Sequence, residues 1–223
     1  MHPATPSTHV ELWLATQNPK KLAELERLVP HGIAVHTLAE LPEGAAFTIV
    51  EDAPDFRGNA EKKAAGAAAF LREAVTAGWR PTDQVLVLAD DSGLCVDALD
   101  GRPGVHSARY AGESASDADR VRKLLGELGD TPAAKRTARF VCCLVVCDLD
   151  GAVFFTTEQT CEGMIREVSS GTQGFGYDPV FRPAEIQGDI SFADLTATEK
   201  DAVSHRGKAL RRLVAALEGQ LHG

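Results

Sequence analysis

The stretch QVLVLADDSG, residues 84–93, decides the predicted fold of this 223-residue chain. Residues 84–89 are apolar and rich enough in β-branched side chains to form a short buried strand. Two neighbouring acids, Asp90 and Asp91, then fall at the C-terminal end of that strand. Because ligands of open α/β sheets bind outside the carboxyl ends of the strands, we expect a functional site here.

Strand and helix patterns alternate around this stretch. A strand at residues 11–15 leads into TQNPKKLAELERLV, where Asn18 is a suitable N-cap and Pro19 suits the first helical position. A strand at residues 33–38 and an alanine-rich helix at about residues 57–77 come next along the chain. After the central strand, Ser116 is the N-cap candidate of a further amphipathic helix.

The last third of the chain is predicted to contain a hairpin and a final helix. RFVCCLVVC and AVFFTTEQTCEGMI have the pattern of two antiparallel strands joined at Asp148-Leu149-Asp150-Gly151. A glycine-rich loop precedes another strand, and a last helix spans about residues 198–220. We therefore predict an α/β protein with a mixed sheet flanked by helices and two lobes around a cleft. Residues 1–9 are expected to be an N-terminal extension and residues 10–223 a single domain.

Composition excludes several functional classes. The net charge of −9 argues against the basic face that duplex nucleic acid requires, although a small anionic ligand needs only a few cations. No apolar run approaches the roughly 20 residues of a membrane span, and the first residues lack the pattern of a signal peptide. The five cysteines form no CxxC pair, which favours reduced packing thiols. We expect a cytoplasmic protein with no membrane or nucleic-acid partner.

The segment TQNPKK, residues 16–21, is the first candidate site. Thr16 and Asn18 lie in a turn at a helix N-terminus, and Lys20 and Lys21 follow at once. Free amide donors, the helix dipole and ammonium groups together suit a phosphate group. An ordinary N-cap with solvated lysines is the simpler interpretation and is favoured on these residues alone.

Acidic residues form the second candidate site. Asp90 and Asp91 are joined by Glu51 and Asp52 from the long connection upstream. Carboxylates that converge on one cleft can bind Mg²⁺, and phosphate and water then complete its octahedron. One carboxylate could also deprotonate a water molecule. A strand-end cap with unrelated surface acids would explain an isolated Asp-Asp pair equally well.

Two further segments offer contacts for a planar base. GFGYDP, residues 174–179, places Phe175 between glycines, where a base could stack on its ring, although Phe175 could also belong to the core. TEKDAVSHRGKAL carries Lys200, His205 and Arg206, three donors that could bind an oxo group of a base or a phosphate, or could lie on a solvated helix face. Neither segment has the glycine spacing of a dinucleotide fingerprint or a P-loop.

CDLDGAVF, residues 147–154, supports an alternative function. It resembles the nucleophile motif of haloacid-dehalogenase-like phosphatases, in which Asp148 would be the nucleophile. The second acid motif of such enzymes would have to be GDISFAD, only about forty residues downstream, which leaves too little chain for the intervening βαβ units. A hairpin turn explains Asp150-Gly151 more simply.

Taken together, these motifs resemble those of the inosine/xanthosine triphosphate pyrophosphatase family. The resemblance runs from about residue 10 to residue 217 and rests on TQNPKK, FRGNAEKKA, LADDSGLCVDAL, PGVHSARYAG, GFGYDPVF and EKDAVSHRGKAL, in that order. It implies an elongated α/β fold and a homodimer. It also implies Mg²⁺-dependent hydrolysis of non-standard purine nucleoside triphosphates (ITP, dITP and XTP) to the monophosphate and pyrophosphate, which cleanses the nucleotide pool.

The resemblance also assigns roles by matching position. Asp91 matches the catalytic acid of the family, and Glu51 and Asp91 match its metal ligands. The residues implied to bind the substrate are Thr16, Gln17, Asn18, Lys20, Lys21, Lys63, Ser92, Phe175, Gly176, Tyr177, Asp178, Lys200, His205 and Arg206. A nucleotide-binding sensor without turnover stays open as a second alternative, although the presence of both acids speaks against it.

Overall fold

The centre of the protein is a mixed β-sheet. The computed structural model describes residues 10–16, 18–30, 32–81 and 83–221, and within them the sheet has six strands in the order β2-β1-β3-β4-β5-β6. β1 pairs in parallel with β2 and β3, and the other pairs are antiparallel. The sheet confirms the predicted fold class. Its strands are β1 (Val10–Leu14), β2 (Ile33–Thr37), β3 (Gln84–Val96), β4 (Thr137–Cys147), β5 (Val153–Ile165) and β6 (Phe181–Pro183).

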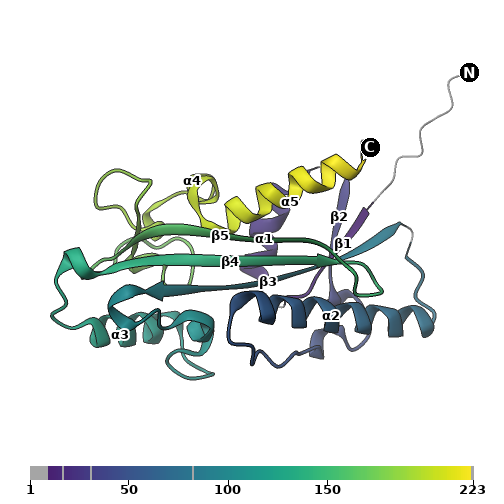
Figure 1. Ribbon diagram of the computed structural model, residues 1–223, viewed down its shortest axis with the longest axis horizontal. Coiled ribbons are helices and arrows are strands. Elements are labelled where there is room, and N and C mark those ends of the chain that lie inside the picture. Colours follow the sequence, from purple (N-terminus) through teal and green to yellow (C-terminus); the bar gives the residue numbers. More distant parts are fainter. Residues whose placement is uncertain (1–9, 17, 31, 82, 222–223) are drawn as a thin grey trace, which may run out of the picture.

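Helices cover the sheet on both faces of an elongated molecule. In Figure 1, α2 and α3 lie below the long strands β3, β4 and β5, and α4 and α5 lie above them. None of the helices in the described ranges is long and apolar enough to cross a membrane. The helices are α1 (Pro19–Leu28), α2 (Phe56–Thr76), α3 (Asp117–Leu128), α4 (Ala197–Val203) and α5 (His205–Leu221). Short 3-10 helices lie between them: η1 (Leu38–Glu40), η2 (Gly44–Ala46), η3 (Asp97–Leu99), η4 (Gly104–Arg109), η5 (Ala133–Lys135), η6 (Asp178–Val180) and η7 (Phe192–Asp194).

Local sequence signals explain where two helices begin. The side chain of Asn18 accepts a hydrogen bond from the backbone of Lys20, and Pro19 opens α1, as predicted. Ser116 and Asp119 form a capping box at the start of α3. Both helices therefore start where an orphan backbone donor finds a side-chain acceptor.

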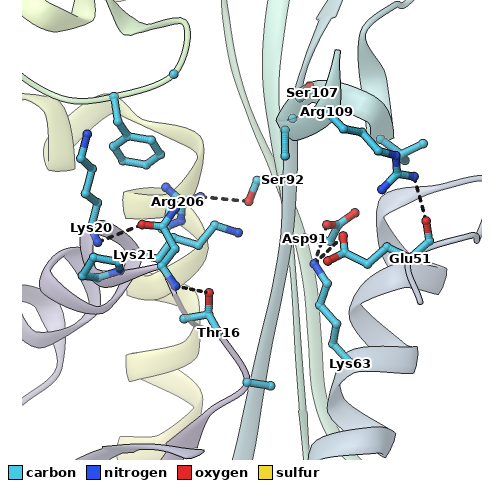
Figure 2. Close-up of a pocket in the computed structure, with 18 of the residues that line it drawn as sticks. Thr16, Lys20, Lys21, Glu51, Lys63, Asp91, Ser92, Ser107, Arg109 and Arg206 are labelled. Atoms are coloured by element: carbon cyan, nitrogen blue, oxygen red, sulfur yellow. Dashed lines mark hydrogen bonds and ion pairs between the residues drawn. The ribbon is translucent and has the colours of Figure 1, made fainter. Parts of the chain in front are cut away.

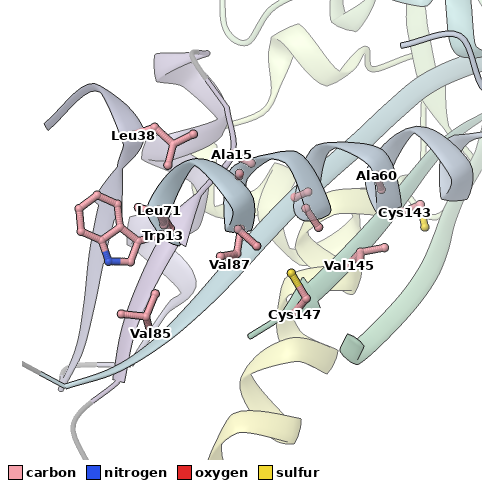
Figure 3. Packing of buried hydrophobic residues seen from close by; sticks show 14 of the residues in the cluster. Trp13, Ala15, Leu38, Ala60, Leu71, Val85, Val87, Cys143, Val145 and Cys147 are labelled. Atoms are coloured by element: carbon pink, nitrogen blue, oxygen red, sulfur yellow. The ribbon is translucent and has the colours of Figure 1, made fainter. Parts of the chain in front are cut away.

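Three hydrophobic clusters divide the molecule into two halves. One packs α2 on β3 and β4, and its alanines allow close approach (Figure 3). A second packs α1 and α5 on the opposite face of the same part of the sheet. The third lies around α3, β6 and the far ends of β3 to β5. All five cysteines are free, and four of them are buried. The first two clusters pack on opposite faces of the same part of the sheet and form one half of the molecule, and the third cluster forms the other half. The cleft predicted from the sequence lies between these halves.

The central strand is longer than the sequence predicts. β3 does not end at Ala89, and Asp90 and Asp91 therefore lie inside the strand. β1 pairs with β3 only as far as Leu88, whereas β4 pairs with it as far as Val96. The antiparallel partner supplies the hydrogen bonds that let polar residues continue the strand, which is a tertiary override of local propensity. From Ala89 onward, β1 no longer pairs with this edge of β3, and the cleft opens there.

The predicted final helix is two helices. Ser204 is extended (φ −67°, ψ 154°) and separates α4 from α5. Its hydroxyl accepts a hydrogen bond from the backbone of Gly207, 3.0 Å away, and so caps α5. A β-carbon at Gly207 would collide with the carbonyl oxygen of Asp201, so the tight corner requires glycine. The break puts His205 and Arg206 in the first turn of α5.

We predict that Ser204→Ala lowers the free energy of unfolding by about 1 kcal/mol, because the substitution removes the cap of a buried helix start. Urea denaturation measures this difference. Ser169 is an exposed serine outside the helices and gives the control, since Ser169→Ala should change the free energy by less than about 0.5 kcal/mol. Equal stabilities of the two variants would contradict the capping role.

Candidate active site

A cavity of about 720 Å³ lies at the edge of β3 that β1 leaves free. Residues from both halves of the molecule line it. The site residues predicted from the sequence meet in this one cavity, except Gln17, which lies outside the described residues. They are Thr16, Asn18, Lys20, Lys21, Glu51, Lys63, Asp91, Ser92, Phe175, Gly176, Tyr177, Asp178, Lys200, His205 and Arg206.

The turn before α1 forms one wall of the cavity. The hydroxyl of Thr16 accepts a hydrogen bond from the backbone of Asn18 at 3.2 Å, which holds the turn. Lys20 donates to the carbonyl oxygen of Gly174 at 3.3 Å, and the ammonium group of Lys21 pairs with Asp90. Figure 2 shows Thr16 and Lys21 on one side of the strand that carries Ser92. The backbone amides of Asn18 and Lys20 are bonded within the turn, contrary to the expected free amide donors, so the ammonium groups of Lys20 and Lys21 are what this wall offers to an anion.

An acidic wall lies on the other side of the same strand (Figure 2). The ammonium nitrogen of Lys63 is 2.8 Å from Oδ1 of Asp91 and 2.9 Å from Oε2 of Glu51. It also donates to the carbonyl oxygen of Asp90 at 3.2 Å. One lysine therefore holds together two carboxylates that would otherwise repel each other.

Two residues that the sequence analysis missed hold this wall in place. Asn59 is fully buried; its oxygen accepts from the backbone of Ala53 at 3.0 Å and its amide donates to Asp91 at 3.3 Å. The guanidinium of Arg109 donates to the carbonyl oxygen of Glu51 at 2.9 Å. Asn59 precedes Lys63 by four residues on α2, and this spacing could have placed both on one helix face. No sequence signal connects Arg109 with Glu51.

The acids carry charge in an unfavourable environment. Burial raises the pKa of Asp91 above its ordinary value, against the lowering effect of Lys63, and Asp90 and Glu51 raise it further. Burial lowers the pKa of Lys63, but Asp91 and Glu51 outweigh it, so that this pKa is raised. The two acids of this wall are thus balanced by the cations Lys63 and Arg109, and the raised pKa of Asp91 shows that burial still disfavours its charge.

Glu51 and Asp91 are the carboxylates of this wall that could hold a divalent cation. Within the described part of the chain, no group of three or more histidine, cysteine or acidic side chains is arranged to bind a metal ion. Mg²⁺ is commonly held by only one or two carboxylates, and substrate phosphates and water complete its shell. The donor set therefore fits Mg²⁺ together with a phosphate ligand.

Donors gather around Glu24 of α1, a buried acid that the sequence analysis also missed. Its carboxylate accepts from Arg206 at 2.6 Å and from Lys200 at 3.3 Å. Lys200 also pairs with Asp178 at 2.7 Å. Burial would raise the pKa of Glu24, but the charges of Arg206 and Lys200 outweigh it and lower this pKa. The two cations are thus fixed by buried acids and keep further N–H groups for a ligand.

The GFGYDP loop supplies the aromatic surface beside these donors. The carboxylate of Asp178 accepts from the backbone of Phe175 at 2.8 Å, and a β-carbon at Gly174 (φ 75°) would collide with it. The ammonium group of Lys200 lies 4.7 Å from the centre of the Phe175 ring. Tyr177 is buried, and its hydroxyl donates to the carbonyl oxygen of Ser107 at 2.9 Å. This hydrogen bond joins the GFGYDP loop to η4. The backbone of Gly176 donates to Asp117 at 2.8 Å.

Comparison with known proteins identifies the family. The sequence profile of the Ham1 family matches residues 12–216. The chain belongs to the Ham1 family. A dITP/XTP pyrophosphatase of Geobacillus kaustophilus is 45% identical over 204 residues, covering 91% of this chain and 92% of the relative. One of Shouchella clausii is 43% identical over 210 residues, covering 94% and 97%. Both chains are matched over almost their whole lengths.

Solved structures share the fold. The HAM1 protein from Coxiella burnetii superposes with a TM-score of 0.79 at 35% identity, covering 94% of this chain and 99% of that one. A nucleoside-triphosphatase / dITP/XTP pyrophosphatase from Mycobacterium abscessus gives a TM-score of 0.67 at 39% identity, covering 92% and 98%. The Ham1 fold thus accounts for nearly all of the chain.

The candidate nucleophile of the phosphatase alternative lies elsewhere in this Ham1 protein. Asp148 follows β4, and its carboxylate accepts hydrogen bonds from the backbones of Asp150 and Ala152, both at 2.9 Å. It is not among the residues that line the cavity. The carboxylate therefore stabilises the hairpin turn between β4 and β5, and no observation supports a nucleophilic role.

His205 is a neutral side chain in the Ham1 site. It is 5% exposed and stacks on Phe140, with ring centres 4.8 Å apart. Burial lowers the pKa of His205 well below its ordinary value, and the charges of Arg206 and Lys200 lower it further. Among the residues that the structure describes, its Nδ1 atom has no hydrogen-bond partner. A neutral ring can offer one N–H donor and one acceptor to a ligand.

We predict that His205 makes the protein less stable in mild acid. The unfolded state binds a proton below about pH 6.5, whereas the folded state keeps the ring neutral, so stability is fully present above that pH and falls below it. Between pH 7.5 and 5.5, the wild type should lose about 1 kcal/mol more free energy of unfolding than His205→Phe, which keeps the stack. Urea denaturation at both pH values measures this, and exposed His106→Gln is the control. Identical losses in wild type and His205→Phe would refute it.

Proposed function

We propose that this protein is a Mg²⁺-dependent pyrophosphatase that hydrolyses ITP, dITP and XTP to the monophosphate and pyrophosphate and thereby cleanses the nucleotide pool. The observation that carries the proposal is one cavity holding an anion-binding turn, two acids across a lysine and a set of buried donors beside an aromatic ring. The names of the similar proteins support it, since they are dITP/XTP pyrophosphatases. A homodimer and a cytoplasmic location stay predictions.

The distribution of charge favours one orientation of the substrate. The triphosphate would lie against the turn at Thr16 and between Lys21 and Lys63, whose side chains line the cavity. The base would lie by Phe175 and Lys200, where the carboxylates of Glu24 and Asp178 are already paired with Lys200. This orientation brings the α-phosphate to the middle of the cavity, near Asp91.

The chemistry would follow from the acidic wall. Glu51 and Asp91 would hold Mg²⁺, which, when bound, neutralises charge on phosphate oxygens. Asp91 orients a water molecule and takes its proton as the water oxygen attacks the α-phosphorus. The bond from the α-phosphorus to the bridging oxygen breaks, and the electron pair leaves with pyrophosphate. Lys21 and Lys63 stabilise the charge that grows on this leaving group.

Base selectivity would depend on hydrogen-bond polarity. Inosine and xanthosine present an oxygen acceptor at purine position 6, whereas adenosine presents an amino donor. Three groups of Arg206 already donate, to Asp90, Glu24 and Ser92, so that its orientation is fixed. An adenine amino group that meets fixed donors would stay unpaired in a buried site, which costs binding in the transition state.

We predict that product analysis of a panel of nucleoside triphosphates gives pyrophosphate and monophosphate from ITP, dITP and XTP, and at least about 100-fold lower kcat/KM with ATP. Removal of Mg²⁺ by chelation should abolish turnover. Release of orthophosphate would instead favour a phosphatase, and binding without turnover would favour a sensor. Comparable kcat/KM for ITP and ATP would contradict the base-selectivity scheme.

Asp91→Asn should separate activity from stability. We expect kcat for ITP to fall by about 10³, because the base that takes the proton from water is lost. The thermal midpoint should stay equal or rise, because the fold raises the pKa of Asp91 and so disfavours its charged form. Asp52→Asn is the matched control, an exposed neighbouring acid that pairs with Lys62 outside the cavity. Near-normal pyrophosphate release by Asp91→Asn would disprove the assignment.

A further inference from the structure

Asp90 is the neighbour of the proposed catalytic acid, yet it does not line the cavity. Successive side chains of β3 point to opposite faces, so Asp91 faces α2 and Asp90 faces the side of α1 and α5. Asp90 is 5% exposed. Asp91 is equally buried but lines the cavity, so the direction of the Asp90 side chain, and not its burial, separates its carboxylate from the cavity wall.

The partners of Asp90 are themselves groups of the cavity. The ammonium group of Lys21 pairs with Oδ1, the hydroxyl of Ser92 donates to Oδ2 at 2.8 Å, and Nε of Arg206 donates to Oδ2 at 3.2 Å. These three side chains come from α1, β3 and α5, and all of them line the cavity. One buried carboxylate thus fixes groups from three separate elements.

The carboxylate also holds two cations together. Lys21 belongs to the end of the cavity assigned to phosphate, and Arg206 to the end assigned to the base. Without an anion between them the two positive groups would repel each other in a poorly solvated place. Burial would raise the pKa of Asp90, but the charges of Arg206 and Lys21 outweigh it and keep this pKa well below its ordinary value.

The fourth partner of Asp90 is Cys142. Its sulfur lies 3.1 Å from Oδ2 of Asp90, it is fully buried, and it does not line the cavity. Burial and the charge of Asp90 raise the pKa of Cys142 well above its ordinary value, so the group stays a thiol and can donate. Its neighbour Cys143 faces α2 in the cluster of Figure 3 and packs against apolar side chains. The paired cysteines therefore differ: one donates to an acid, and the other only packs.

We propose that Asp90 is a positioning residue that fixes Lys21 relative to Arg206, and so couples recognition of the phosphates to recognition of the base, with the thiol of Cys142 holding Asp90 in place. The proposal rests on the proposed function, because it needs a substrate that reaches both cations. It assigns Asp90 to binding and selectivity, whereas Asp91 is assigned to the chemical step.

The first test is steady-state kinetics of Asp90→Asn with ITP and ATP. The amide is isosteric, but it removes the charge that holds both cations and presents donors to them. We expect KM for ITP to rise at least about 10-fold, by a larger factor than kcat falls, and the ratio of kcat/KM for ITP over ATP to drop about 10-fold. A merely structural role would lower the active fraction and leave both KM and the ratio unchanged, and that result would overturn the proposal.

The cysteines give a second test that does not depend on Asp90→Asn folding. Cys142→Ala should raise KM for ITP about threefold, and Cys142→Ser, which keeps a donor, should restore it to within about a factor of two. Cys143→Ala is the matched control. It removes an equally buried sulfur from the next residue of β4, one that does not contact Asp90, and should leave KM unchanged. Equal KM values for all three variants would overturn the role of Cys142.

The proposed function and the positioning role of Asp90 can be refuted separately. A wild-type protein that releases no pyrophosphate from any purine nucleoside triphosphate would refute the proposed function itself. An active wild type whose KM and selectivity are indifferent to Asp90→Asn would leave the function standing and refute only the positioning role. If Asp90→Asn is insoluble, the cysteine series decides whether the hydrogen bond to Asp90 affects substrate binding.

Discussion

The site depends on the unequal lengths of the two partners of β3. The parallel partner β1 ends opposite Leu88, and the antiparallel partner β4 continues to Val96. The second half of β3 is thus held rigidly on one edge and left open on the other. Backbone bonds to β4 fix the directions of Asp90 and Asp91, while the chain leaving β1 has room to turn into α1 beside them. A rigid strand with a free edge is what lets polar side chains be both precisely placed and accessible.

Buried charges around this edge are arranged in alternation. Glu24, Asp90 and Asp178 each contact at least one of the cations Lys21, Lys200 and Arg206. Removing a single partner from such a network leaves an uncompensated charge in a dry place, which costs several kcal/mol. The network is therefore poor as a source of stability and good as a source of fixed geometry. That geometry is what discrimination between similar bases requires.

Local patterns in the sequence predicted the elements that rest on local physics. The turn and N-cap at Asn18, the hairpin turn after Asp148 and the cap at Ser116 were all found from short stretches. The length of β3 was not, because it depends on pairing with residues some fifty positions away. Nor was the corner at Ser204, where tertiary packing against Asp201 decides the path. The motifs singled out the residues that meet in the cavity. Of the buried partners that orient them, Asn59 has a signal in its helical spacing from Lys63, whereas no local pattern points to the role of Glu24.

The short distance between two residues of α1 has a mechanical meaning. Lys21 faces the phosphate end and Glu24, less than one turn later, anchors both cations at the base end. Any tilt or slide of that helix must displace both ends at once. The protein therefore has little freedom to widen the base end for a bulkier base without also moving Lys21 at the phosphate end. A nucleotide whose base fits poorly should then lose contacts to its phosphates as well as to its base.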